Sequence, residues 1–249
     1  MACGAVPAAA IGEALEWREG EGHRWARLRE AGESGPGFTR LPPGRTGVLF
    51  TNQLARERYT TNQIYLNGSG VALGDIDGDG WVDVYLCGLD GPNVLYRNLG
   101  DWRFEDITAS AGVACEDLDA TGAVFADLNG NGHLDLAVSS IHGGIRIFFN
   151  DGGGRFKPRT ADRPLNPGRG GMTLAFADVD GNGTLDMYAA NYRAATIRDQ
   201  LTARFTVKMV DGRPVVVGIN DRPLRPEDAG RFLLAPDGQV IENGEADVL

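Results

Sequence analysis

The chain has 249 residues and a formal net charge of −10, a length that suits one or two domains with a sizeable core. Its acidity argues against nucleic-acid binding and against attachment to an anionic lipid surface. No apolar run approaches the roughly 18 residues that a membrane-spanning helix needs.

The first part of the chain, residues 1–44, is expected to be an N-terminal extension and linker. Its opening "MACGAVPAAAIGEALEW" has small apolar residues but no basic n-region. It is therefore either the remnant of a signal peptide or a disordered terminus. Residues 11–31 suit a short helix, and the Gly/Pro-rich stretch 31–47 reads as linker. A leading β segment is expected over 45–67.

The stretch "LGDIDGDGWVDVYL" spaces oxygen-bearing side chains regularly along a loop. Positions 1, 3, 5 and 9 are Asp75, Asp77, Asp79 and Asp83, position 6 is Gly80, and position 7 offers the carbonyl of Trp81. This is the set of six to eight oxygens that Ca²⁺ takes. Without a cation, carboxylates ~4 Å apart would repel by roughly 4 kcal/mol per pair. A polar hairpin turn is the simpler alternative for one isolated copy.

The loop recurs twice, with first positions 52 and then 51 residues further on. The second copy is Asp127, Asn129, Asn131, His133 and Asp135, and the third is Asp178, Asp180, Asn182, Thr184 and Asp186. An EF-hand would need a glutamate at position 12, where this chain has Leu86, Val138 and Ala189. The repetition therefore predicts about three Ca²⁺ sites. The residue at position 7 contributes its main-chain carbonyl, so the His133 side chain is expected in solvent.

Short apolar runs flank each loop and predict strands. Asn98 and Asn150 each follow their loop's first aspartate by 23 residues, and Phe104 and Phe156 follow six residues later. Four short strands in about 50 residues is the size of a β-propeller blade. The expected order is blade 1 at 68–118, blade 2 at 119–168 and the first half of blade 3 at 169–191.

The unit "GDIDGDGWVD…NVLYRN…RFED" resembles the FG-GAP or VCBS repeat of integrin α-subunit propellers and of exported bacterial proteins. The segments "LPPGRTGVLFTNQL" and "NQIYLNGSGVALGD" resemble the sequences of the cartilage acidic protein branch, whose longer members carry an ASPIC/UnbV domain. The resemblance covers about 38–249 and implies a calcium-stabilised, non-enzymatic propeller on an exported protein. An extracellular, periplasmic or cell-surface location follows. The chain departs from the family's pattern in two ways. The second loop has only two carboxylates, and an ASPIC/UnbV-like region is lacking.

The third unit is interrupted. Residues 192–246 read as β-hairpins, with turns at Asp211-Gly212, Asn220-Asp221 and Asp237-Gly238. Residues 247–249 then match Asn93-Val94-Leu95, as if the third blade resumes. We therefore expect an all-β fold, an incomplete propeller of about two and a half four-stranded blades plus the hairpin insertion, forming the N-terminal piece of a longer protein.

No catalytic signature is found in the sequence: there is no GxSxG elbow, Walker A loop, HExxH helix or Cys/His zinc spacing. We expect a non-enzymatic recognition or adhesion scaffold whose longer connections contact an unknown protein or glycan ligand. The alternative is part of a propeller-based, for example polysaccharide-active, enzyme whose catalytic residues lie outside this chain. Cys87 and Cys115 fit either a disulfide within a blade or two buried thiols.

Overall fold

The computed structural model describes residues 17–20, 23–26, 39–160, 163–199, 202–228 and 230–249, in two compact units that divide after Leu41. In the first unit, β1 (Trp17–Gly20) and β2 (His23–Ala26) form an antiparallel hairpin. The helix expected over 11–31 is therefore wrong where the structure describes that range. Glycines at positions 20 and 22 each disfavour a helix by about 1 kcal/mol relative to alanine. The remaining residues of that helix, Cys3 and the opening 16 residues lie outside the described part.

The expected leading β segment over 45–67 is also wrong. This stretch holds α1 (Pro43–Thr46), α2 (Arg56–Thr61) and the 3₁₀ helix η1 (Gln63–Asn67). The hydroxyls of Thr60 and Thr61 each donate to carbonyls of the preceding helical turn at 2.9 Å. Arg58 lies over the ring of Tyr65 at 4.4 Å, and both side chains donate to Asp119. Tertiary anchoring of this kind overrides weak local propensity.

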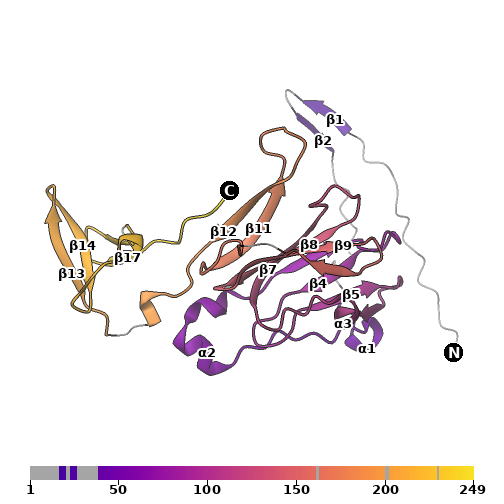
Figure 1. Cartoon of the computed structure of the whole chain (residues 1–249), viewed down its shortest axis with the longest axis horizontal. Helices are drawn as coiled ribbons and strands as arrows, with labels where there is room; N and C mark the ends of the chain where they lie inside the picture. The colour runs from indigo at the N-terminus through magenta and orange to yellow at the C-terminus, as the bar shows by residue number, and fades with distance from the viewer. Residues whose placement is uncertain (1–16, 21–22, 27–38, 161–162, 200–201, 229) are drawn as a thin grey trace. The chain divides into compact units, whose positions relative to one another are not determined.

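Two four-stranded antiparallel sheets follow, each an up-and-down meander (Figure 1). The first contains β3 (Val71–Gly74), β4 (Asp83–Leu86), β5 (Val94–Asn98) and β6 (Phe104–Asp106). The short helix α3 (Thr108–Ala111) leads on to the second, which contains β7 (Asp119–Ala126), β8 (Asp135–Ile141), β9 (Gly144–Asn150) and β10 (Phe156–Pro158). The prediction of an all-β chain built from four-stranded blades is confirmed.

A third sheet has two strands, β11 (Gly171–Ala177) and β12 (Asp186–Asn191). An isolated antiparallel bridge joins Ala189 to Val248. In the first sheet, Leu86 at the equivalent position of β4 pairs with Val94 at the start of β5. Val248 therefore occupies, next to β12, the position that a third blade strand takes in the complete sheets.

The stretch 192–246 between these two parts forms hairpins, in agreement with the predicted turns. Its elements are η2 (Ile197–Asp199), β13 (Phe205–Val210), β14 (Arg213–Ile219), β15 (Arg222–Pro223), η3 (Pro226–Asp228), β16 (Phe232–Leu234) and β17 (Val240–Glu242). Both residues of the Asp211-Gly212 turn have positive φ, at 49° and 75°, as do Asn220 and Asp221, at 50° and 61°. Positive φ at both central residues marks the type I′ turn, whose twist matches that of the paired strands.

The main core lies between the two complete sheets. Its side chains alternate along β8, where Leu136 and Val138 face the first sheet and Ala137 faces the third, as the two-residue period of a strand requires. All seven residues of β8 are consequently buried. Cys87 and Cys115 lie in the same core as free, buried thiols. Of the two alternatives, a disulfide or two buried thiols, the structure has the buried thiols.

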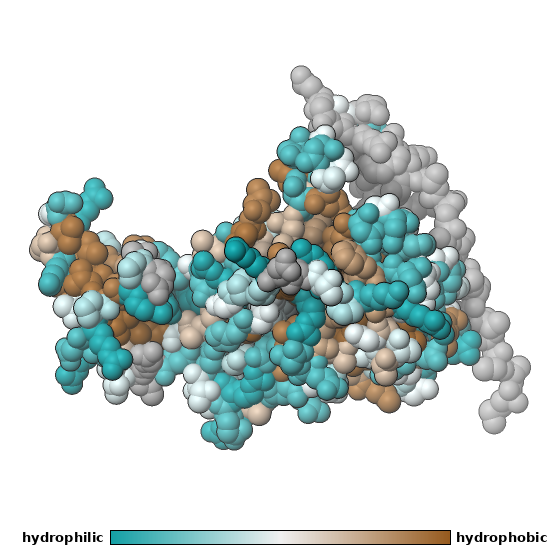
Figure 2. All heavy atoms as spheres, in the orientation of Figure 1, coloured by the Kyte–Doolittle hydropathy of each residue, from teal (hydrophilic) through white to brown (hydrophobic). Residues whose placement is uncertain are grey.

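Close approach of the first strands brings the sheets together. A Cβ on Gly122 of β7 would lie 2.6 Å from the carbonyl oxygen of Met172 in β11, so only glycine fits there. Figure 2 shows apolar side chains at the surface around β11 and β12, where Leu185 and Tyr188 are exposed. Among the described residues, no helix is long and apolar enough to cross a membrane. The described sheets make up part of a propeller and do not close into a ring.

Candidate metal centres

Three loops connect the first and second strands of the three sheets. We call the segment 75–83 loop 1, 127–135 loop 2 and 178–186 loop 3. Each has glycines with positive φ at positions 4 and 6: Gly78 and Gly80 at 75° and 90°, Gly130 and Gly132 at 75° and 85°, and Gly181 and Gly183 at 73° and 87°. Left-handed backbone at two alternate positions winds the chain tightly and is favourable only for glycine.

The aspartate at position 1 organises each loop. Asp75 accepts the N–H of Gly78 at 2.8 Å and of Gly80 at 2.9 Å, and Asp127 accepts the matching pair, both at 2.8 Å. In loop 3, Asp178 accepts the N–H of the position 6 glycine at 2.9 Å. These donors, that of Gly132 first, hold the pKa of Asp127 below its ordinary value.

The aspartate at position 9 begins the second strand and ties the loop to the sheet. Its carboxylate accepts the N–H at position 2 in all three loops, at 2.9 Å for Asp83, 2.9 Å for Asp135 and 3.0 Å for Asp186. In the two complete sheets the other oxygen accepts the N–H of Asn98 or Asn150, both at 2.8 Å. Asp83 is fully buried, and desolvation raises its pKa to about 6.

Positions 3, 5 and 7 repeat a second set of bonds. The side chains of Asp77, Asn129 and Asp180 at position 3 accept the N–H of position 5 at 3.3, 3.0 and 3.1 Å. Those of Asp79, Asn131 and Asn182 at position 5 accept the N–H of Trp81, His133 and Thr184 at 2.8, 2.9 and 2.8 Å. All three side chains at position 7 are exposed. The loops therefore share one hydrogen-bonded frame despite their different sequences.

The structure brings some predicted ligands together and not others. Carboxylate oxygens of Asp75, Asp77 and Asp83 lie within 4.8 Å of one another, as do those of Asp178, Asp180 and Asp186. Asp79 is not in the first set, because its carboxylate turns to the N–H of Trp81. Loop 2 has carboxylates only at Asp127 and Asp135, and amides stand at its positions 3 and 5.

The donor chemistry fits a hard divalent cation. The two clustered sets offer carboxylate oxygens and include no sulfur or nitrogen donor of the kind that zinc prefers. Three anionic oxygens within 4.8 Å of one another, one of them on the buried Asp83, repel strongly, and a cation of charge +2 removes that cost. The residues present therefore fit Ca²⁺ best in loop 1 and loop 3.

The sequence did not single out the contact that joins the first two loops. Asn150, buried at the end of β9, donates through Nδ2 to the carbonyl of Ile76 in loop 1 at 2.7 Å and to that of Leu134 in loop 2 at 3.0 Å. The Nδ2 of Asn98, its counterpart in the first sheet, donates to Val82 of its own loop at 2.9 Å. The shared 23-residue spacing of the two asparagines was the available signal, but it does not reveal a contact between sheets.

Comparison with known proteins bears on the same loops. The family model for the FG-GAP-like repeat matches residues 75–138 and again 127–189, so each match starts at the first aspartate of a loop. Residues 75–189 therefore contain FG-GAP-like repeats. These repeats thus run from one metal-type loop through the strands of a blade into the next loop.

Similarity to curated relatives extends beyond the repeats. The chain is 27% identical over 190 residues to cartilage acidic protein 1 of Homo sapiens, covering 74% of this chain and 28% of the human protein. It is 30% identical over 148 residues to cartilage acidic protein 1 of Xenopus tropicalis, covering 58% of this chain and 22% of the relative. The chain thus spans less than a third of the length of the curated relatives it matches.

Proposed function

We propose that this chain is a calcium-stabilised FG-GAP scaffold that presents its longer connections to a protein or glycan ligand outside the cytoplasm. The observation that carries the proposal is one hydrogen-bonded loop frame that recurs in three sheets, with clustered carboxylates in loop 1 and loop 3. A turn that served flexibility alone would not need the same oxygen-bearing side chains at the same positions. The FG-GAP family supports the scaffold role.

The ligand oxygens would come from the side chains at positions 1, 3, 5 and 9 and from the main-chain carbonyl at position 7. In loop 1 these are Asp75, Asp77, Asp79, Trp81 and Asp83; in loop 2 Asp127, Asn129, Asn131, His133 and Asp135; in loop 3 Asp178, Asp180, Asn182, Thr184 and Asp186. A bound Ca²⁺ would supply the positive charge that lets these carboxylates stay ionised while packed together. Carboxylate number ranks the expected affinity as loop 1, then loop 3, then loop 2.

The role we propose for these carboxylates is structural and not catalytic. Each position 1 aspartate already accepts several backbone N–H groups. Each position 9 aspartate, the first residue of a strand, accepts the N–H of the loop residue at position 2. Groups held this way cross-link two strands, and ion binding would then fix the register on which neighbouring blades pack. An extracellular, periplasmic or cell-surface location, where calcium is abundant, suits such a device.

Thermal unfolding in calcium, in magnesium and in chelator tests the proposal. We expect the melting temperature to rise with millimolar Ca²⁺, because an ion that binds only the folded loops stabilises them by mass action. Magnesium should be a poor substitute, since it dehydrates reluctantly and demands octahedral geometry. An identical melting curve in all three conditions would show that calcium does not stabilise the fold.

A matched pair of variants separates a ligand from a surface charge. Asp75→Asn and Asp237→Asn remove the same charge and keep an acceptor oxygen, but Asp237 lies in the β16–β17 turn, where it accepts the N–H of Gln239 at 3.0 Å. We expect Asp75→Asn to lose part of the calcium-dependent rise in melting temperature and Asp237→Asn to keep it. Equal behaviour of the two variants would mean that calcium acts on overall charge and not on loop 1.

A further inference from the structure

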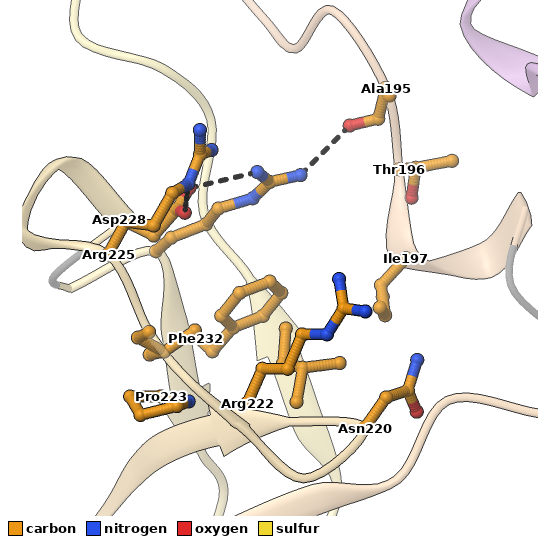
Figure 3. A pocket seen from close by; sticks show the side chains of 12 residues that line it. Ala195, Thr196, Ile197, Asn220, Arg222, Pro223, Arg225, Asp228 and Phe232 are labelled. Carbon is orange, nitrogen blue, oxygen red and sulfur yellow. Dashed lines mark hydrogen bonds and ion pairs between the residues drawn. The ribbon is translucent and has the colours of Figure 1, made fainter.

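A pocket of about 600 Å³ lies within the inserted segment 192–246, away from the three loops (Figure 3). Its walls come from the stretch before η2, the β14–β15 turn, the residues around η3 and the start of β16. The volume falls in the range of about 300–1,000 Å³ that is typical of small-ligand sites. Neither the FG-GAP repeats nor the calcium proposal gives this pocket a role.

A buried carboxylate fixes the walls. The Glu242 side chain, only 3% exposed, accepts from Arg231 at 2.6 Å and Arg193 at 3.2 Å. It also accepts the hydroxyl of Thr196 at 3.0 Å and the N–H of Ile197 at 2.9 Å. These bonds join the stretch before η2 to β16 and β17. The wall formed by the stretch before η2 and by Arg231 is therefore held in place by bonds within the chain.

The lining carries an excess of positive charge. Three arginines and one aspartate face the pocket, although the whole chain has a net charge of −10. Arg225 and Arg231 both pair with Asp228, at 2.9 and 3.1 Å. The composition of the chain does not explain a basic pocket, so a local cause is needed.

Arg222 supplies the charge that is not paired within the described part of the chain. It begins β15 and is exposed. Figure 3 shows its guanidinium extending across the pocket toward Ile197, beside the side chain of Asn220. Half-buried Ile197 and Leu224, together with Pro223, supply apolar surface around it. A cation on an apolar wall suits a ligand with an anionic end and a hydrocarbon or sugar body.

We infer that this pocket binds a small organic carboxylate through Arg222. The planar guanidinium fork matches a carboxylate with two parallel hydrogen bonds, and the apolar side chains cover the ring or chain that carries it. A metal cation is disfavoured by the positive lining, and a nucleic acid by the acidity of the chain as a whole. The carboxylate can belong to a uronic acid or to a non-sugar acid, and the choice of probes distinguishes these sources.

Calorimetric titration of the full chain with glucuronate, benzoate and neutral glucose, all at one fixed calcium concentration, tests the inference. We expect saturable binding of at least one of the two carboxylates and none of glucose. Binding of glucuronate in preference to benzoate would identify a sugar ligand, and the reverse order a non-sugar acid. Binding should weaken as salt is added, because the pairing is electrostatic.

Two arginine variants give the decisive contrast. Arg222→Gln should weaken carboxylate binding by roughly tenfold or more, as expected for loss of a charged hydrogen-bonding partner. Arg213→Gln, which removes the same charge from an exposed position on β14 outside the pocket, should change it by less than about twofold. Absence of saturable binding by either carboxylate, or equal effects of the two variants, would overturn the inference and leave the calcium proposal untouched.

Discussion

The second complete sheet and the third, two-stranded sheet begin with nearly the same sequence and end in different surroundings. Loop 2 and loop 3 share the hydrogen bonds of the position 1 and position 9 aspartates. Yet every residue of β8 is buried, whereas β12 has one buried residue, Ala189. Asp135 is fully buried, and its counterpart Asp186 is half-buried. The loop frame is thus a local property of the sequence, and its burial is supplied by the strands and sheets around it.

The largest difference in stability is expected between core substitutions in the second sheet and in the third. Leu136 and Met187 hold the same place after their loops, but Leu136 is fully buried and Met187 half-buried. Leu136→Ala should reduce the free energy of unfolding by about 2–5 kcal/mol, and Met187→Ala by about 1 kcal/mol. Urea unfolding of the two variants measures both values. Equal losses would show that the third sheet is as well enclosed as the second.

The next effect concerns the buried aspartate of loop 1 in the absence of calcium. Burial raises the pKa of Asp83 from 3.8 to about 6. The folded chain therefore binds the carboxyl proton of Asp83 more tightly than the unfolded chain does. Stability from this group is present at low pH and is lost as pH rises from about 4 to 6, by an amount on the order of 2 kcal/mol.

Asp83→Asn should remove most of that dependence, as measured by urea unfolding in chelator between pH 4 and 7. Asp186→Asn is the matched control, because Asp186 holds the same position in loop 3 but is only half-buried, so its desolvation is smaller. With calcium present the direction changes: the ion requires the ionised carboxylate, so affinity at loop 1 should fall below about pH 6. A flat stability profile in the parent chain would contradict the burial argument.

A smaller effect is expected at the contact between the first two sheets. Asn98→Ala removes the side-chain bonds to Val82 and Gly100. Asn150→Ala removes the matching bonds to Leu134 and Gly152 and, in addition, the bond to Ile76 in loop 1. Since a buried hydrogen bond contributes about 0.5–1.5 kcal/mol, we expect Asn150→Ala to cost about 1 kcal/mol more than Asn98→Ala. Unfolding curves that coincide would mean that the contact with Ile76 adds nothing.

The sequence predicted what is decided locally. Side-chain oxygens at alternate positions, the position 6 glycine and the hairpin turns at Asp211-Gly212 and Asn220-Asp221 each specify a backbone shape within a few residues, and the structure has these turns. It failed at 45–67, where helices are held by long-range bonds of Arg58 to Asp90 and Asp119. The contact of Asn150 with Ile76 and the pocket at Arg222 likewise depend on residues far apart in the chain, which spacing does not reveal.

Isothermal calorimetry with Ca²⁺, on the parent chain and on Asp75→Asn under the same conditions, measures whether the loops bind calcium. We expect saturable binding of up to three ions per chain, with the tightest site weakened on the order of tenfold or more in Asp75→Asn because carboxylate number tunes affinity. No saturable binding in the millimolar range, or an unchanged tightest site in Asp75→Asn, would contradict the calcium proposal.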